Sequence, residues 1–194
     1  MCGRFSLDVS IDVLIERYKA IKNMEEFKLP DEIFPTNTVP IVINKDNIQL
    51  SMMKWGFMPE FTKKPIINAR AETADIKPLF RNSFYNKRCL VPATSFFEWE
   101  NLDGKKIKRR ISVKGENIFS LAGLYNIFRD KNGQEQESFT IITTDANENM
   151  KKIHHRMPVI LPKEMEEYWL DINFRNLDTL KSMMKPYDGE IIIV

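Results

Sequence analysis

Cys2 stands directly after Met1, and this position allows the most distinctive chemistry in the chain. If Met1 is removed, Cys2 becomes the first residue and carries an α-amine and a thiol on adjacent carbons. The amine can condense with an aldehyde to an imine, and the thiol can then close that imine into a thiazolidine. Both groups titrate near neutrality, so a modest environmental change makes either one nucleophilic. Chain termini are usually poorly ordered, so position alone does not decide the role of Cys2.

Other segments place chemically costly residues in apolar or turn-like surroundings. Asn68 follows two β-branched residues, and Glu98 lies within an aromatic run. His154 and His155 are the two histidines of the chain and precede an apolar run. A histidine exchanges protons near pH 7, and a carboxylate buried among aromatics can shuttle them. Each residue also fits a structural role, since Glu98 can point outward on a strand and a histidine can be a hydrogen-bonded scaffold residue.

The elements that must position these residues can be read from periodicity and turn signals. Apolar spacing after Ser10 predicts a helix over 10–19, and a hairpin is predicted over 41–52. Residues 72–85 are predicted as a helix interrupted at Pro78. From residue 89 the pattern is strongly β, with predicted strands at 89–91, 96–99, 107–113, 118–125, 138–144 and 191–194. Further helices are predicted at 146–153, 163–170 and 177–184.

Together these elements predict an α+β fold formed by a single domain over residues 1–194. We expect a mainly antiparallel β-sheet curled into a barrel-like core, with a few flanking helices. The Trp55-Gly56 pair is expected to form an exposed aromatic turn, although a tryptophan is more often a core residue.

Composition excludes several classes of protein. The net charge is +2, with 43% hydrophobic and 29% charged residues, as in an ordinary globular protein. No apolar stretch is long enough for a membrane span and no signal peptide is evident, so we expect a cytoplasmic protein. Two cysteines make no disulfide framework, and no spacing indicates a metal or cofactor site; Cys89 is interpreted as a buried structural thiol. The basic run 105–110 is interpreted as a solvated hairpin that is compatible with phosphate binding without arguing for it.

Four motifs in this order resemble the SOS response-associated peptidase family, whose members shield abasic sites in single-stranded DNA. They are Met1-Cys2-Gly3-Arg4-Phe5, Asn68-Ala69-Arg70-Ala71-Glu72-Thr73, Cys89-Leu90-Val91-Pro92-Ala93 with Phe97-Glu98-Trp99, and His154-His155-Arg156-Met157-Pro158. The Trp55-Gly56 turn and the segment 143–147 also fall where the family places such segments. The chain departs from the family pattern at Thr94-Ser95, where a glycine is common, and at Phe61, where a tryptophan often stands.

The resemblance implies that Cys2, after methionine removal, attacks the ring-opened aldehyde of an abasic deoxyribose. It implies supporting roles in the active site for Asn68, Glu98 and His154. It further implies the DNA contacts Arg4, Pro35, Trp55, Arg70, Thr143 and Arg156. The expected partner is single-stranded DNA that contains abasic sites. The expected protein is a monomer without cofactor, associated with the nucleoid when bound to DNA.

Two other functions remain open. The same Cys2, Glu98 and His154 would serve a thiol peptidase or N-terminal-nucleophile hydrolase, including one that removes its own Met1. A noncovalent single-stranded DNA binding module would instead bind intact DNA without any dependence on Cys2. Strand cleavage by β-elimination is a further reaction that could compete with capture.

Overall fold

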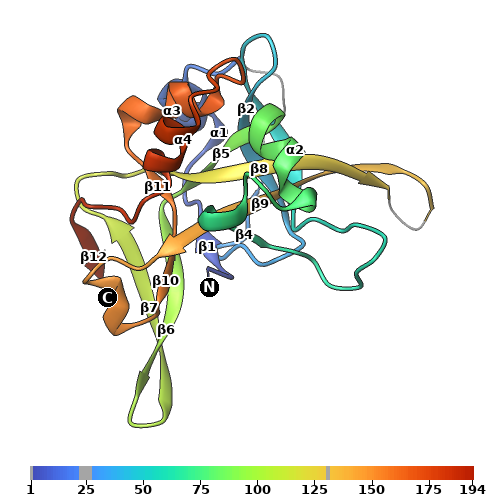
Figure 1. The fold of residues 1–194 in the computed structure, drawn as a ribbon. Coiled ribbons are helices and arrows are strands. Elements are labelled where there is room, and N and C mark those ends of the chain that lie inside the picture. The colour runs from blue at the N-terminus through green and yellow to red at the C-terminus, as the bar shows by residue number, and fades with distance from the viewer. Residues whose placement is uncertain (1, 22–27, 130–131) are drawn as a thin grey trace.

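The computed structural model describes residues 2–21, 28–129 and 132–194 (Figure 1). Its strands are β1 (Phe5–Ser6), β2 (Thr38–Asn44), β3 (Ile48–Trp55), β4 (Asn68–Arg70), β5 (Arg88–Ala93), β6 (Ser95–Leu102), β7 (Lys105–Val113), β8 (Phe119–Arg129), β9 (Glu135–Asp145), β10 (Arg156–Pro158), β11 (Ile160–Leu161) and β12 (Ile191–Ile193). Its helices are α1 (Ile11–Tyr18), α2 (Pro78–Asn86), α3 (Lys163–Leu170) and α4 (Leu177–Met183), with 3₁₀ turns η1 (Ala71–Thr73) and η2 (Met150–Lys152). No helix within these ranges is long and apolar enough to cross a bilayer.

The larger sheet closes on itself. Its strand order is β10-β9-β3-β2-β5-β8-β11, and β8 also pairs with β9, which joins the two ends of the central run into a ring. The pairings are antiparallel except that β3 and β4 each run parallel to β9. Buried β-branched and leucine side chains such as Val42, Leu90 and Ile141 fill the interior of the sheet. The predicted α+β fold with a barrel-like core is therefore confirmed, with two parallel pairings that the sequence pattern did not indicate.

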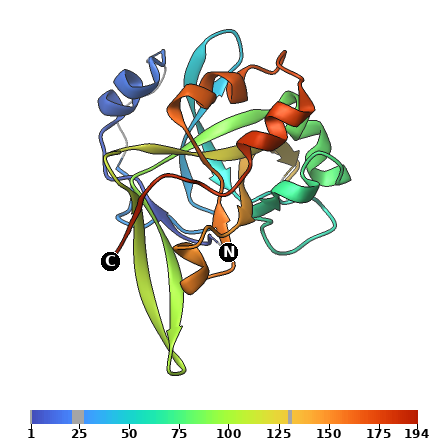
Figure 2. The ribbon, with the colours of Figure 1, turned by 60° about the vertical axis from the view of Figure 1, so that its left-hand side comes forward.

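A second sheet, in the order β1-β6-β7-β12, carries the N-terminal segment on its edge. Its longest part is the β6–β7 hairpin, which projects away from the body of the molecule in both views (Figures 1 and 2). The hairpin turns at Asp103 and Gly104, which both adopt positive φ angles of 50° and 79°. This pair of left-handed residues matches the twist that tight hairpins require. The basic run 105–110 lies on β7, so the predicted hairpin is confirmed.

The helices gather around the ring, with α1, α3 and α4 at one end of it in Figure 1. Helix α1 begins where predicted, because the Ser10 hydroxyl accepts a hydrogen bond from the Val13 amide. Pro78 does not interrupt a helix but starts α2, a position where its missing N–H costs nothing. The helix predicted over 146–153 is wrong: only η2 forms, because the Asn147 side chain bonds both the Met150 amide and the Tyr187 carbonyl.

Candidate active site

Cys2 occupies an ordered position on the edge of the smaller sheet. Strand β1 pairs with β6, and the Phe97 amide continues the ladder by donating to the Arg4 carbonyl at 2.9 Å. The Cys2 side chain is fully buried, and its Sγ donates to the same Arg4 carbonyl at 3.8 Å. A second anchor is the bridge between Phe5 and Ile33 on the outer side of β1. The segment that carries the thiol is therefore fixed beside β6 rather than frayed.

Glu98 is the carboxylate that β6 places next to this segment. Its side chain is 4% exposed. Burial, followed by the nearby Glu98 carboxylate, raises the pKa of the Cys2 thiol to about 12. The same carboxylate acts on His154, whose pKa is lowered by burial while the negative charge of Glu98 opposes that shift. The structure thus brings Cys2, Glu98 and His154 within electrostatic reach of one another.

His154 lies between η2 and β10 and is held by its own backbone neighbours. The Arg156 amide donates to His154 Nδ1 at 2.9 Å, and the ring stacks on His155 with centroids 4.4 Å apart. Nδ1 also lies 3.2 Å from the Arg156 carbonyl oxygen, so it accepts from the Arg156 amide in one neutral tautomer and donates to the Arg156 carbonyl in the other. A neutral ring also agrees with the lowered pKa of His154. In the tautomer that carries its proton on Nε2, His154 can donate that proton and take one back there.

Asn68 is the first residue of β4, beside Ile141 of β9. Both polar atoms of its side-chain amide are buried, and within the described residues neither has a hydrogen-bond partner. Leaving a buried amide unpaired costs about 1–3 kcal/mol, so such a group is kept where a ligand can satisfy it. Asn68 can therefore accept hydrogen bonds from a bound molecule and donate hydrogen bonds to it.

Trp55 connects the segments that carry Cys2 and Asn68. Its ring meets Phe5 edge-on with centroids 5.1 Å apart and stacks on Phe139 at 6.2 Å. Its indole N–H donates to the Ile67 carbonyl, one residue before Asn68, at 3.1 Å. The side chain is fully buried, so the expectation of an exposed aromatic turn is wrong. Trp55 has no accessible surface for a DNA contact and instead spaces β1 from β4.

The other residues predicted to contact DNA fall into an accessible and a buried group. Arg70 is exposed, while Arg4 and Pro35 are partly exposed. Thr143 is fully buried, and Arg156 is 7% exposed. The side chains of Arg70, Arg4 and Pro35 are therefore accessible to DNA in this structure. The two buried side chains are not accessible and can act only by supporting their neighbours.

Arg156 has a structural task that its burial explains. Its guanidinium binds both oxygens of Glu72, at 2.5 and 3.0 Å, and also contacts Asp145 at 2.8 Å and the Thr143 carbonyl at 2.6 Å. These hydrogen bonds hold the pKa of Glu72 below its usual value. Paired charge-assisted bonds of this kind are strong and geometrically specific. Arg156 therefore ties η1 to β9 and β10, two residues after His154.

Phe61, and not Trp55, is the exposed aromatic side chain of this region. It lies in the loop that the bridge between Phe57 and Ile66 closes, and its side chain is 78% exposed. A hollow of about 750 Å³ beside this loop is lined by residues that include Lys54, Lys63 and Arg129. The signal was available, because Phe61 stands among polar and charged residues whereas Trp55 ends an apolar strand.

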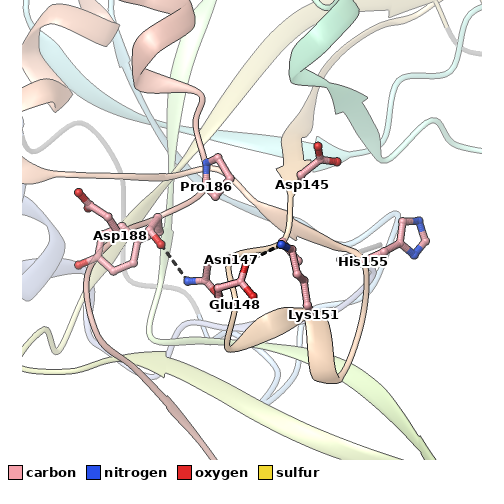
Figure 3. Close-up of a pocket in the computed structure, with 9 residues that line it drawn as sticks. Asp145, Asn147, Glu148, Lys151, His155, Pro186 and Asp188 are labelled. Carbon is pink, nitrogen blue, oxygen red and sulfur yellow. Dashed lines mark hydrogen bonds and ion pairs between the residues drawn. The ribbon is translucent and has the colours of Figure 1, made fainter.

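A second hollow, of about 610 Å³, lies beyond η2 and has the opposite character (Figure 3). Asp145 and His155 lie on one side of it and Asp188 on the other, with Glu148 and Lys151 between them. Its lining carries three carboxylates and one ammonium group, and one of these carboxylates, Asp145, is already paired with Arg156. Neither Cys2 nor Glu98 lines this hollow, so it is not part of the candidate active site. Within the described ranges no group of three histidine, cysteine, aspartate or glutamate side chains is arranged to hold a metal ion.

The chain is similar in sequence to proteins that are already known. A sequence model described as SOS response associated peptidase (SRAP) matches residues 1–194. The Bacillus subtilis protein named abasic site processing protein YoqW is 40% identical over 203 residues, covering 98% of this chain and 89% of the relative. The Escherichia coli protein named abasic site processing protein YedK is 31% identical over 141 residues, covering 71% of this chain and 63% of the relative.

A solved structure shares the fold over nearly the whole chain. A protein from Bacteroides thetaiotaomicron, known by crystallography, superposes with a TM-score of 0.88 at 32% identity. The match covers 99% of this chain and 90% of that protein. The family model covers the whole chain and so includes β1, β4, β6 and β10, the elements that carry the candidate site.

Proposed function

Because the chain belongs to the SOS response associated peptidase family, we propose that it processes abasic sites in DNA. The observation that carries this proposal is the fixed N-terminal thiol of Cys2 beside the acid–base pair of Glu98 and His154. An abasic site offers the ring-opened aldehyde that an N-terminal aminothiol captures. The similar proteins YoqW and YedK are both named abasic site processing proteins.

The reaction that fits these groups is covalent capture as a thiazolidine. After removal of Met1, the α-amine of Cys2 attacks the C1′ aldehyde of the open deoxyribose to give a carbinolamine. The carbinolamine loses one water and becomes an imine. The Cys2 sulfur then adds to the imine carbon while its proton passes to the nitrogen, which closes the ring. The balance is one carbon–nitrogen bond and one carbon–sulfur bond formed, with one water released.

Each of the three supporting side chains matches one requirement of this reaction. His154 donates from Nε2 to open the sugar ring, whose closed hemiacetal form otherwise hides the aldehyde. Glu98 takes and returns the protons of the carbinolamine and the thiol. The buried, unpaired amide of Asn68 orients the sugar hydroxyls by hydrogen bonds.

The surroundings of the Cys2 thiol bear on the choice between this reaction and the peptidase alternative. A cysteine peptidase needs a thiolate, and its cysteine pKa is lowered by cationic neighbours. Here burial and the Glu98 carboxylate raise the pKa of Cys2 to about 12. A neutral thiol suits addition to an imine after the amine has attacked, because the Glu98 carboxylate can relay the thiol proton to the imine nitrogen at that step. The observation favours amine-first capture over attack of a thiolate on an amide.

The DNA strand is held mainly through its backbone in this proposal. Arg70 is exposed for phosphate contact, and Arg4 and Pro35 flank the Cys2 segment. Phe61, rather than Trp55, supplies the aromatic face on which a base can stack. Thr143 and Arg156 act indirectly, because their hydrogen bonds link β9 to β4 and β10, and Arg156 also binds Glu72 of η1. Because the backbone contacts are made to phosphates, the affinity for DNA should fall as the salt concentration rises.

One experiment tests the proposal against its alternatives. The protein is incubated with a single-stranded oligonucleotide that carries one abasic site and is then run on a denaturing gel. Wild type should give a band that survives denaturation, Cys2→Ala should give none, and Cys89→Ala should match wild type. Intact mass must show loss of Met1, because the Cys2 nitrogen is otherwise an amide. No band with processed wild type would overturn the proposal, and peptide cleavage without DNA would favour the peptidase.

A further inference from the structure

One face of the β6–β7 hairpin carries a line of cations. Lys106, Lys108 and Arg110 alternate along β7 and so point to the same side. Their cross-strand partners on β6, which share that face, are Asn101, Trp99 and Phe97. Arg4 reaches the same face, with its guanidinium 4.9 Å from the centroid of the Trp99 ring. We call Arg4, Lys106, Lys108 and Arg110 the cationic stripe.

Two members of the cationic stripe converge on one carboxylate, Glu32. Arg4 Nη1 donates to Glu32 Oε2 at 3.0 Å, and Lys108 Nζ donates to Glu32 Oε1. These hydrogen bonds hold the pKa of Glu32 below its usual value. The carboxylate is therefore ionised at neutral pH and is shared by two cations.

Aromatic rings hold both cations in place. The Arg4 guanidinium lies between the Phe34 ring, at 4.2 Å, and the Trp99 ring, so its N–H edge faces Glu32. Lys108 Nζ lies 4.3 Å from the centroid of the Phe97 ring. All three members of this cluster remain partly open to water, since the side chains of Arg4, Lys108 and Glu32 are 25%, 36% and 28% exposed. The two cations are thus preorganised around an anion that another anion can replace.

A phosphodiester is the anion that matches this arrangement. Like a carboxylate, it carries one negative charge on two oxygens, and a guanidinium edge binds both kinds of group in the same way. Arg4 is two residues from Cys2, so the Cα atoms of these residues are at most about 7 Å apart. Glu98 and Trp99 point to opposite faces of β6. A DNA strand that reaches both the Cys2 thiol and the cationic stripe therefore crosses the end of β1.

We propose that Glu32 is an internal substitute for a DNA phosphate, which it replaces at Arg4 and Lys108 until a single strand binds. The inference rests on the proposed function and adds two residues, Glu32 and Lys108, that set affinity for the strand. Glu32 weakens binding to intact DNA, because the phosphate must displace it. Lys108 contributes one cation to the complex and part of its salt dependence.

The test measures noncovalent binding in the Cys2→Ala background, where no adduct can form. Fluorescence anisotropy follows binding of a labelled, intact single-stranded oligonucleotide across a salt series. Glu32→Gln should tighten binding by about three- to tenfold at low salt, since two exposed ion pairs no longer compete. Lys108→Ala should weaken binding and reduce the slope of log affinity against log salt by about 0.7.

The pair Lys114–Glu190 supplies matched controls. It is an exposed ion pair just beyond the C-terminal end of β7, and Lys114 lies about 20 Å from Lys108 along the chain. Glu190→Gln and Lys114→Ala change the net charge by the same amounts and should each alter affinity less than twofold. Thermal unfolding of every variant in the same buffer checks that the fold is retained. Glu32→Gln binding no tighter than Glu190→Gln would overturn the inference.

The inference and the proposed function fail in distinguishable ways. If wild type forms the denaturation-resistant band but Glu32→Gln and Glu190→Gln bind DNA equally, only the role of Glu32 is wrong. If wild type forms no band, the proposed function is wrong, while the affinity series still decides whether Glu32 competes with phosphate. In the double variant Glu32→Gln with Lys108→Ala, the gain from removing Glu32 should shrink, because one of the two released cations is gone.

Discussion

The two cysteines of this chain are equally buried and differ in their surroundings. Cys2 and Cys89 both have no exposed surface, and burial raises the pKa of both thiols. Cys89 lies on β5 inside the ring, opposite Gly123 of β8, and burial is the whole cause of its shift. Cys2 lies at the chain end beside Glu98, whose charge adds to the shift.

The difference shows what converts a buried thiol into a reactive one. Burial alone keeps a thiol neutral and without any group to receive its proton. The Cys2 region adds a carboxylate, a histidine, and a backbone nitrogen that becomes an amine when Met1 is lost. The Cys89 region offers packing, and its carbonyl accepts the Trp169 indole N–H at 3.1 Å. Neighbours and chain position, rather than burial, separate the two.

Exchanging each cysteine for alanine gives the largest expected contrast. Cys2→Ala should abolish the denaturation-resistant band with abasic DNA, because both new bonds of the thiazolidine need that residue. Cys89→Ala should leave the rate of band formation within about twofold while lowering the free energy of unfolding by about 1–2 kcal/mol. The gel assay and chemical denaturation measure the two effects. A loss of crosslinking in folded Cys89→Ala would break the comparison.

Glu98→Gln removes the charge that distinguishes the two thiols while keeping the shape of the side chain. We expect the rate of adduct formation to fall by about a hundredfold, within the range for loss of a general acid–base group. Single-turnover gels measure this rate, and anisotropy with intact DNA should show unchanged affinity. If Glu98→Gln forms the adduct as fast as wild type, the carboxylate has no catalytic role.

Gly123→Ala probes the Cys89 side of the comparison. A Cβ at this position would lie 2.8 Å from Cys89 Sγ and 2.9 Å from Val91 Cγ2. Overpacking of this kind should lower the free energy of unfolding by about 1–3 kcal/mol without changing the crosslinking rate. Adding Cys89→Ala removes one of the two clashing atoms, so the double variant should lose less stability than the sum of the single changes. Strict additivity in denaturant unfolding would show that the thiol does not limit the space.

Local signals in the sequence account for most of the fold. Ser10 caps α1, the Asp103-Gly104 turn closes the hairpin, and α3 has the predicted bounds 163–170. The helix predicted over 146–153 does not form, because the Asn147 side chain donates to the Tyr187 carbonyl, 40 residues away, and so stabilises a turn instead. Propensity over a short window contains no information about such a distant partner.

The candidate site was predictable in its residues and not in its geometry. The motifs around Cys2, Glu98 and His154 named groups that the fold brings together. The contacts that bury Trp55 were not predictable, because Phe5 and Phe139, which pack against it, lie 50 and 84 residues away. The convergence of Arg4 and Lys108 on Glu32 likewise depends on three separate strands and loops meeting at one edge. Pairings between distant segments determine which charged groups are free, and no local pattern encodes them.

The smallest expected difference between the Cys2 region and the Cys89 region is in how the free energy of unfolding depends on pH. Burial lowers the pKa of His154 in the folded chain below its unfolded value near 6.5, so the folded state binds fewer protons between those two values. Stability is therefore present above about pH 6.5 and falls as the pH drops toward the lowered pKa. His154→Gln should flatten this acid-side loss, measured by urea unfolding from pH 7.5 to 5, whereas Cys89→Ala should shift the whole curve without changing its slope. An unchanged slope in His154→Gln would mean that the histidine is protonated as easily in the folded chain as in the unfolded one, and the neutral imidazole assigned to the Cys2 region would be wrong.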